Sequence, residues 1–202
     1  MTPASDTERK AARLLPMQDA DLEAVIAIEQ TAYSHPWTRG NFRDALASGY
    51  WMQCLRVQDE LLGYVVAMAG VQETHLLNIT VAPERQRQGW AHMMLDALCL
   101  WSRRQGAEWL WLEVRESNRR ALQVYERYGF RRVGLRKDYY PADRQQREHA
   151  VVMSLNLKLN HDRSDPFRSR RAPARHAGRN GHSRLVAANA HRPRANLNLR
   201  SP

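Results

Sequence analysis

Apolar positions recur along the first 157 residues with two different periods. A spacing of three and four residues predicts helices at residues 19–33, 38–48, 88–105 and 117–129. Thr38 is a favourable N-cap for the second helix, and Ser117 with Asn118 begins the last one. Glycines at positions 49, 106 and 129 mark the ends of three of these segments, where a helix commonly stops.

Runs of β-branched, aromatic and other apolar residues predict the strands. The clearest are residues 50–57 and 61–69, an antiparallel hairpin, and residues 74–81, which continue the meander. Further strands are predicted at residues 13–15, 109–114, 130–136 and 149–155. The last two are joined by a polar loop that contains Tyr139, Tyr140 and Pro141. This order predicts a mixed α/β (α+β) fold, with one layer of sheet and helices on its faces.

Charge divides the chain into a nearly neutral body and a basic tail. The whole chain carries +10, but residues 161–202 hold ten Arg and two Asp, and so account for +8. Bulk charge is therefore no argument that the body binds nucleic acid. We expect a mobile segment at residues 1–11, a single domain at residues 12–157 and a disordered Arg-rich tail at residues 158–202. Such a tail is open to weak, salt-sensitive contact with nucleic acid.

The remaining composition excludes several classes of protein. Cys54 and Cys99 share no motif spacing, and His75, His92 and His149 lack metal-ligand spacing, so neither disulfides nor a metal site are predicted. Residues 1–10 have no apolar signal core, and the longest apolar run, residues 61–71, is too short to cross a bilayer. We therefore expect a soluble, cytoplasmic protein without a membrane partner.

The segment from Asn78 to Ala91 leaves a strand, passes Pro83 and a polar arc, and enters a helix at Gly89. A helix start presents unpaired backbone N–H groups and the positive end of the helix dipole, which together attract phosphate. Arg85 and Arg87 add positive charge. By itself this pattern is also typical of a plain turn with solvated arginines.

Other segments make the pattern specific. Gln86-x-x-Gly89-x-Ala91 resembles the acetyl-CoA loop of the GNAT superfamily of N-acetyltransferases, and residues 111–115 (WLEVR) and 118–130 (NRRALQVYERYGF) resemble its later motifs. The similarity extends over about residues 12–157. Within the superfamily, residues 76–81, 110–115 and 139–141 are most similar to the bacterial ribosomal-protein alanine N-acetyltransferases.

The resemblance implies a mixed sheet that is splayed at its centre to admit the pantetheine arm of acetyl-CoA, which serves as co-substrate. The residues that it assigns to the acyl donor are Ile79, Thr80, Val81, Arg87, Gln88, Gly89, Trp90, Ala91, His92 and Asn118. Gln88, Trp90 and Ala91 depart from the more frequent residues of the motif. Because the loop binds mainly through backbone donors, we expect these departures to weaken the affinity at most.

Glu113 lies within a strand and, by alternation, shares a face with Trp109 and Trp111. A carboxylate beside indoles is partly desolvated, which raises the pKa and suits a general base. The alternative is a Glu that faces water or pairs with Arg115. The family resemblance assigns the role of proton acceptor to this position.

Tyr125 is assigned by the resemblance as the proton donor to the departing thiolate. From the residues alone, a half-buried core Tyr is equally compatible, and Tyr128 is the alternative if the register differs. Asn118 can cap the helix as well as contact the cofactor. His75 is a weak candidate for a water relay. Trp37, Tyr139 and Tyr140 are the residues that, by analogy, frame the acceptor.

The expected reaction is transfer of an acetyl group from acetyl-CoA to a protein N-terminal α-amino group, in particular the alanine of a small-subunit ribosomal protein. Other peptide, Lys or small-molecule amines remain alternatives. So do a binding module that does not turn over and an RNA- or ribosome-binding protein that acts through the basic tail.

Overall fold

The computed structural model describes residues 4–142, 146–158 and 196–198. Its helices are α1 (Asp6–Ala11), α2 (Leu22–Ala32), α3 (Arg39–Ala47), α4 (Trp90–Arg104) and α5 (Arg119–Tyr128), with short 3-10 helices at Asp19–Asp21 and Pro83–Arg85. Its strands are β1 (Ala12–Pro16), β2 (Trp51–Val57), β3 (Glu60–Ala69), β4 (Glu73–Val81), β5 (Trp109–Arg115), β6 (Arg131–Pro141), β7 (Arg147–Asn156) and β8 (Asn196–Asn198). No helix in these ranges is long and apolar enough to cross a membrane.

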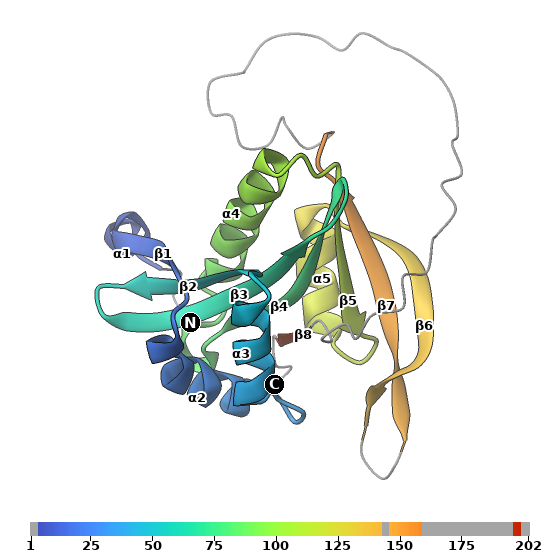
Figure 1. Ribbon diagram of the computed structural model, residues 1–202, viewed down its shortest axis with the longest axis horizontal. Coiled ribbons are helices and arrows are strands. Elements are labelled where there is room, and N and C mark those ends of the chain that lie inside the picture. Colours follow the sequence, from blue (N-terminus) through green and yellow to red (C-terminus); the bar gives the residue numbers. More distant parts are fainter. Residues whose placement is uncertain (1–3, 143–145, 159–195, 199–202) are drawn as a thin grey trace, which may run out of the picture.

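The strands form one mixed sheet in the order β1-β2-β3-β4-β5-β7-β6. Neighbouring strands are antiparallel except β4 and β5, which are parallel. The short β8 pairs with β4 in parallel, off this path. This arrangement confirms the predicted mixed α/β fold, including the meander of β2, β3 and β4 and the strand–helix alternation after it (Figure 1).

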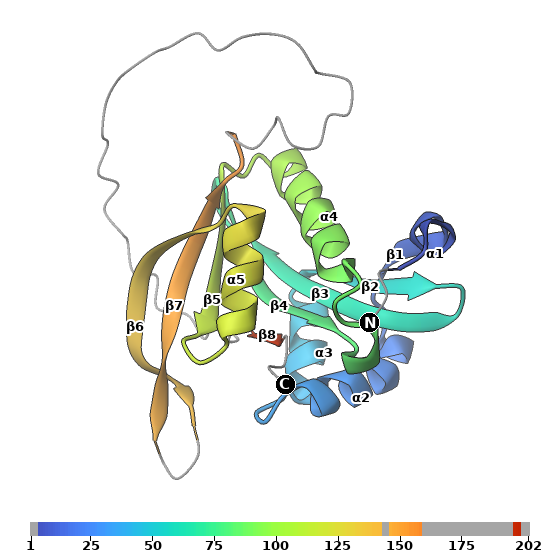
Figure 2. The ribbon, with the colours of Figure 1, turned by 180° about the vertical axis from the view of Figure 1, so that it is seen from behind.

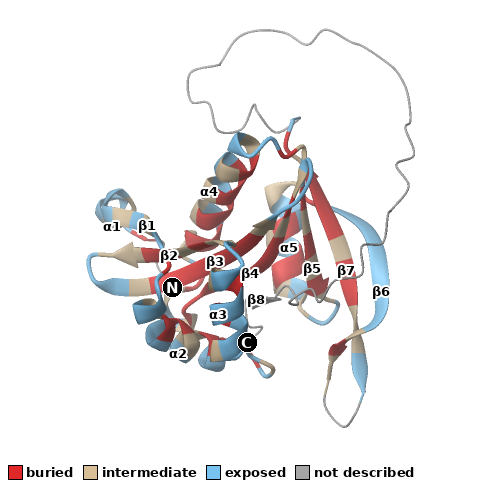
Figure 3. Cartoon of the chain, viewed as in Figure 1, coloured by how far each residue is buried: buried red, intermediate tan, exposed pale blue. Residues whose placement is uncertain are grey.

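Helices cover both faces of the sheet. α2 and α3 lie on one face, and α4 and α5 lie on the other (Figures 1 and 2). Each face has its own core: Leu22, Val25 and Phe42 pack under α2 and α3, whereas Trp90, Met94 and Leu122 belong to the core of the opposite face. Burial is deepest along the central strands, and most of the outer strand β6 is exposed (Figure 3).

Local capping signals explain where several helices begin. The Thr38 hydroxyl accepts from the Asn41 N–H at 3.2 Å, and the Asn41 side chain accepts from the Thr38 N–H in return, which completes a capping box. Asn118 Oδ1 accepts from the Ala121 N–H at 3.0 Å at the start of α5. Both predicted N-caps are therefore confirmed.

Two regions differ from the expectation. Tyr139, Tyr140 and Pro141 are not in a loop but belong to β6, which continues to Pro141 because it pairs with β7 as far as Arg147. The segment expected to be a mobile lead-in contains α1, whose start is held by a capping box between Ser5 and Glu8. Apart from residue 158 and residues 196–198, the expected tail lies outside the described residues.

Candidate functional site

The centre of the sheet opens between β4 and β5. The parallel pairing of these strands runs from Glu73–Trp109 to Leu76–Leu112 and goes no further. At the same point the register of β4 against β3 shifts, because Val66 faces Asn78 whereas Ala67 faces Leu76. A bulge bends a strand, and such bulges are common beside active sites. The expected acyl-donor residues Ile79, Thr80 and Val81 therefore follow the point where β4 leaves β5.

The three described residues of β8 show what this edge of β4 can hold. Asn196–Asn198 pair in parallel with Asn78, Ile79 and Thr80. The backbone of β4 beyond Leu76 is thus open to an extended chain on the side of β5. An extended ligand with amide groups along it would meet the same backbone donors and acceptors.

The loop after β4 leads into α4 through Gly89. This glycine adopts a left-handed conformation with φ +91°, which a residue with a Cβ rarely adopts, and no side chain caps the helix that follows. Trp90 and Ala91 are buried in the core under α4, so their contribution to a ligand is through the backbone. An uncapped helix start directed by a glycine is the expected form of an anion site.

Positive charge collects around this loop. The Arg120 side chain donates to Gln86 Oε1 at 3.4 Å. Burial, and then the nearby charge of Arg87, lowers the pKa of Arg120, so both arginines bring positive charge to this side of the loop. Arg87 itself has φ +64°. The residues present therefore fit a ligand that carries phosphate groups.

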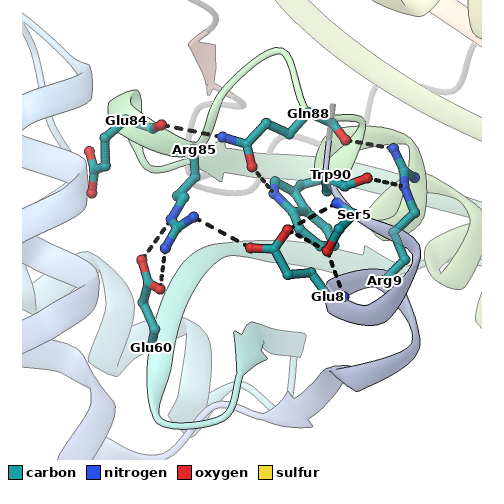
Figure 4. A network of polar contacts seen from close by, with 9 residues as sticks. Ser5, Glu8, Arg9, Glu60, Glu84, Arg85, Gln88 and Trp90 are labelled. Atoms are coloured by element: carbon teal, nitrogen blue, oxygen red, sulfur yellow. Dashed lines mark hydrogen bonds and ion pairs between the residues drawn. The ribbon is translucent and has the colours of Figure 1, made fainter. Parts of the chain in front are cut away.

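The N-terminal helix supports the loop from the other side (Figure 4). Arg9 Nη2 donates to the Gln88 carbonyl oxygen at 2.7 Å, and its guanidinium lies 5.9 Å from the Trp90 ring centroid. Arg85 forms ion pairs with Glu60 and, at 3.8 Å, with Glu8. A Cβ on Gly89 would lie 2.8 Å from Arg9 Nη2, so α1 packs directly on the glycine.

Glu113 points from β5 toward β6 rather than toward open solvent. Its side chain is 15% exposed, and Arg136 Nε lies 3.0 Å from Oε1. The alternative partner Arg115 pairs instead with Glu148 at 3.2 Å. The guanidinium of Arg136 therefore orients the Glu113 carboxylate from the side of β6.

Tyr125 is more buried than the expected half-buried residue, with 2% of it exposed, and its ring packs edge-on against Phe130 at 5.4 Å. Burial, and then the phenols of Tyr33 and Tyr140, raise the pKa of Tyr125 well above its ordinary value. The hydroxyl therefore stays protonated at neutral pH, as a proton donor requires. Tyr128 is tied to α4 instead, where its hydroxyl donates to Asp96 Oδ1 at 2.7 Å.

Comparison with known proteins decides the family. The model of the Acetyltransferase (GNAT) family matches residues 22–130. The chain belongs to this family. As a GNAT protein it is an N-acetyltransferase that uses acetyl-CoA as the acyl donor.

Relatives in bacteria are similar over nearly their whole length. The chain is 34% identical over 139 residues to the [ribosomal protein bS18]-alanine N-acetyltransferase of Haemophilus ducreyi, which covers 69% of this chain and 96% of that relative. It is 33% identical to the Escherichia coli protein of the same name, with 71% and 96% covered.

Solved structures agree with the fold. The crystal structure of the ribosomal-protein-S18-alanine N-acetyltransferase of Escherichia coli superposes with a TM-score of 0.67 at 32% identity, covering 72% of this chain and 94% of that one. Arabidopsis thaliana Naa50, solved in complex with the bisubstrate analogue CoA-Ac-MVNAL, superposes with a TM-score of 0.61 at 16% identity, covering 72% and 99%. At that identity the second likeness concerns the fold alone.

The residues expected to frame the acceptor of this GNAT protein lie in two places. Tyr139 and Tyr140 pack edge-on at 5.0 Å in β6, and the Tyr140 hydroxyl donates to the Glu113 carbonyl oxygen at 3.1 Å. Trp37 lies in the connection between α2 and α3, away from β6. Its indole is buried and packs 5.3 Å from Phe42, so this residue anchors the connection from within.

The histidines have local partners. His75 Nε2 lies 2.8 Å from Glu73 Oε1, a contact within β4. The His92 ring packs 5.8 Å from the Tyr128 ring, and His149 Nδ1 accepts from the Asp138 N–H at 3.0 Å. Among the described residues, His, Cys, Asp and Glu form no group of three that could hold a metal ion.

Two residues of interest were not identified from the sequence. Arg9 belongs to the segment expected to be mobile, although the spacing of Ser5 and Glu8 is the signature of a capping box. Glu29 follows Leu22 and Val25 at helical spacing on the buried face of α2. A carboxylate on an apolar helix face is the signal that could have revealed it.

Proposed function

We propose that this GNAT protein transfers the acetyl group of acetyl-CoA to the N-terminal α-amino group of a protein, with the N-terminal alanine of a small-subunit ribosomal protein as its acceptor. The observation that carries the acceptor class is the match to relatives named for bS18-alanine acetylation, 96% of whose length is covered. The arrangement of Glu113 and Tyr125 supports the chemistry.

The acceptor must lose a proton before or during attack on the thioester. A free α-amino group has a pKa of about 8 and a Lys side chain about 10.4, so a carboxylate deprotonates the α-amine at lower cost. Glu113 accepts this proton in the proposed mechanism. Arg136 at 3.0 Å orients the carboxylate, and the Tyr140 hydroxyl holds the backbone of Glu113 from the same side.

The departing thiolate needs a proton in return. Tyr125 supplies it, because its buried phenol keeps its proton at neutral pH and belongs to the helix that lines the opened sheet. Counted from the ammonium form, two protons leave the nitrogen: one passes to Glu113 before attack, and the second passes from the tetrahedral intermediate to solvent, while one proton passes from Tyr125 to the sulfur. Exchange with solvent restores both groups.

The acyl donor is bound by the remaining proposed residues. Ile79, Thr80 and Val81 present backbone groups along β4, and the N–H groups of this stretch that point away from β3 would stabilise negative charge on the carbonyl oxygen. Arg87, Gln88, Gly89, Trp90, Ala91 and His92 surround the start of α4, where the phosphates would bind. Asn118 serves both as the cap of α5 and as a polar contact for the donor.

The test compares two kinds of amine. The full-length protein is incubated with acetyl-CoA and a peptide that starts with Ala, and the product is sequenced by tandem mass spectrometry. In the control peptide the N-terminus is blocked and one internal residue is replaced by Lys, so that the Lys side chain is its only amine. Acetylation of the α-amine alone is the expected result. Acetylation of Lys, or release of no thiol with the first peptide, would overturn the proposed acceptor.

A further inference from the structure

A buried polar network lies under the α2–α3 side of the sheet. The carboxylate of Glu29 is fully buried, and three groups from different elements donate to it. The backbone N–H of Trp37 donates to Oε1 at 2.8 Å, and the Tyr64 hydroxyl of β3 donates to Oε2. The Asn78 side-chain amide lies 3.4 Å from both oxygens. Glu29 therefore joins the α2–α3 connection to both central strands.

The network continues toward the opened part of the sheet. The Tyr33 hydroxyl lies 2.9 Å from Thr80 Oγ1 and 3.3 Å from Asn78 Oδ1, to which it donates. Thr80 Oγ1 also donates to Asn78 Oδ1 at 3.0 Å. Tyr33 is one of the two phenols that add to the raised pKa of Tyr125. The chain of contacts that starts at Glu29 thus reaches Tyr33 after α2 and Thr80 in β4.

Burying the carboxylate of Glu29 is unfavourable, which indicates that this side chain has a specific role. Burial raises the pKa of Glu29 to about 7, although the donors from Tyr64, Trp37 and Asn78 oppose this effect. A hydrophobic side chain of similar size would avoid that cost, but it would leave the Trp37 N–H without this acceptor. The titratable groups that face the network are the phenols of Tyr64 in β3 and of Tyr33 at the end of α2.

The network and the acyl-donor loop are held by helices on opposite faces of the sheet. α4 lies on one face of the sheet, whereas α2, which contains Glu29, and α3 lie on the other (Figures 1 and 2). A change at Glu29 acts on the segment between residues 33 and 37 and on the side chains of Asn78 and Thr80, whereas the acyl donor is proposed to contact the backbone of β4 and the loop that contains Gly89.

We propose that Glu29 is a positioning residue for the acceptor: its carboxylate holds the Tyr33–Trp37 connection against β4, so that loss of its charge weakens peptide binding and leaves acetyl-CoA binding unchanged. This inference rests on the proposed acetylation of a protein N-terminus. It adds a residue on the face opposite the acyl-donor loop.

The experiment uses the full-length protein, an Ala-starting peptide and acetyl-CoA. Glu29→Gln keeps the shape of the side chain and removes its charge. The matched control is Glu23→Gln, because Glu23 lies on the same helix with its side chain 83% exposed. Steady-state kinetics give kcat and the KM for peptide, isothermal titration calorimetry gives the Kd for acetyl-CoA, and thermal unfolding reports whether each variant folds.

At about pH 8.5 we expect Glu29→Gln to raise the KM for peptide about tenfold and to change the Kd for acetyl-CoA by less than about twofold. The KM ratio between variant and parent should fall toward about one near pH 6, where the parent carboxylate is itself protonated. Tyr64→Phe removes one donor and should raise the same KM about threefold. Glu23→Gln should change none of these values.

The outcomes separate this inference from the proposed function. An unchanged KM in Glu29→Gln, or an equal rise in the KM for peptide and the Kd for acetyl-CoA, shows that Glu29 only supports the core and overturns the inference. If Glu29→Gln does not fold, Tyr64→Phe decides by the same criteria. Failure of the parent protein to acetylate the peptide would instead overturn the proposed acceptor.

Discussion

Glu113 and Arg136 form an ion pair of 3.0 Å between two strands that are separated by β7 in the sheet order. Arg136 pairs with Ala150 of β7, and its guanidinium extends across β7 to Glu113. The pair places a permanent cation beside the proposed base. Through Arg136, the largely exposed strand β6 thus contributes to the site.

Replacing Glu113 by Gln tests its role as proton acceptor. The amide keeps the shape of the carboxylate but accepts no proton, so we expect turnover to fall about 100-fold or more, which is the usual contribution of a general base. The Kd for acetyl-CoA, measured by calorimetry, should remain nearly the same. Glu126→Gln is the control, since this side chain is 42% exposed and pairs with Arg132. Unchanged turnover in Glu113→Gln would remove Glu113 as the base.

Tyr125→Phe removes only the hydroxyl that is proposed to protonate the thiolate. We expect kcat to fall about 100-fold, while the KM for peptide and the melting temperature change little because the ring still packs on Phe130. Tyr128→Phe is the matched control on the same helix, because its hydroxyl donates to Asp96. A larger loss of activity in Tyr128→Phe than in Tyr125→Phe would exchange the two assignments.

Arg9 is expected to matter for the acyl donor although it lies far from the loop in sequence. Arg9→Ala removes the hydrogen bond to the Gln88 carbonyl and the cation that packs on Gly89. We expect the Kd for acetyl-CoA to rise about fivefold, or ~1 kcal/mol, with little change in the KM for peptide. Arg13→Ala is the control, because the Arg13 guanidinium donates to the carbonyl oxygens of its neighbours Lys10 and Ala12. An equal effect of both substitutions would contradict this role.

Deleting residues 159–202 tests whether residues 4–158 are sufficient. Every proposed site residue precedes the deletion, and β8 pairs with Asn78, Ile79 and Thr80, the same stretch of β4 that is proposed to bind the acyl donor. The shortened chain should therefore acetylate the peptide and bind acetyl-CoA at least as tightly as the full chain. Loss of acetylation, or a higher Kd for acetyl-CoA, would show that the tail contributes to the site.

Local rules account for what the sequence predicted well. The caps at Thr38 and Asn118 and the glycine before α4 depend on neighbouring residues alone, so their positions could be predicted. The order of strands and helices followed from periodicity in the same way. These features define the opened sheet and the loop before α4.

Contacts between distant segments account for what it missed. Arg136 approaches Glu113 only because of the register between β6 and β7, and Arg9 contacts Gln88 across 79 positions of sequence. Register and docking of this kind depend on packing of the whole chain and leave no periodic signal. The network of Glu29 likewise connects residues that lie 35 and 49 positions apart.

The buried carboxylate of Glu29 should make stability depend on pH in a recognisable direction. Its pKa is raised from 4.5 to about 7 in the folded chain, so between these values the folded state holds a proton that the unfolded state has released. Stability contributed by this group is therefore lost as the pH rises through that window, and it levels off above it. The full effect amounts to about 3 kcal/mol.

Glu29→Gln lacks this titration. The difference in the free energy of unfolding between Glu29→Gln and the parent, measured by urea denaturation, should shift in favour of the variant by about 3 kcal/mol from about pH 4.5 to pH 8. Other carboxylates titrate in both proteins and cancel in the difference. Glu23→Gln should show no such trend, because Glu23 is exposed. A difference that stays constant over this range would mean that folding does not raise the pKa of Glu29, because the donors from Tyr64, Trp37 and Asn78 offset its burial.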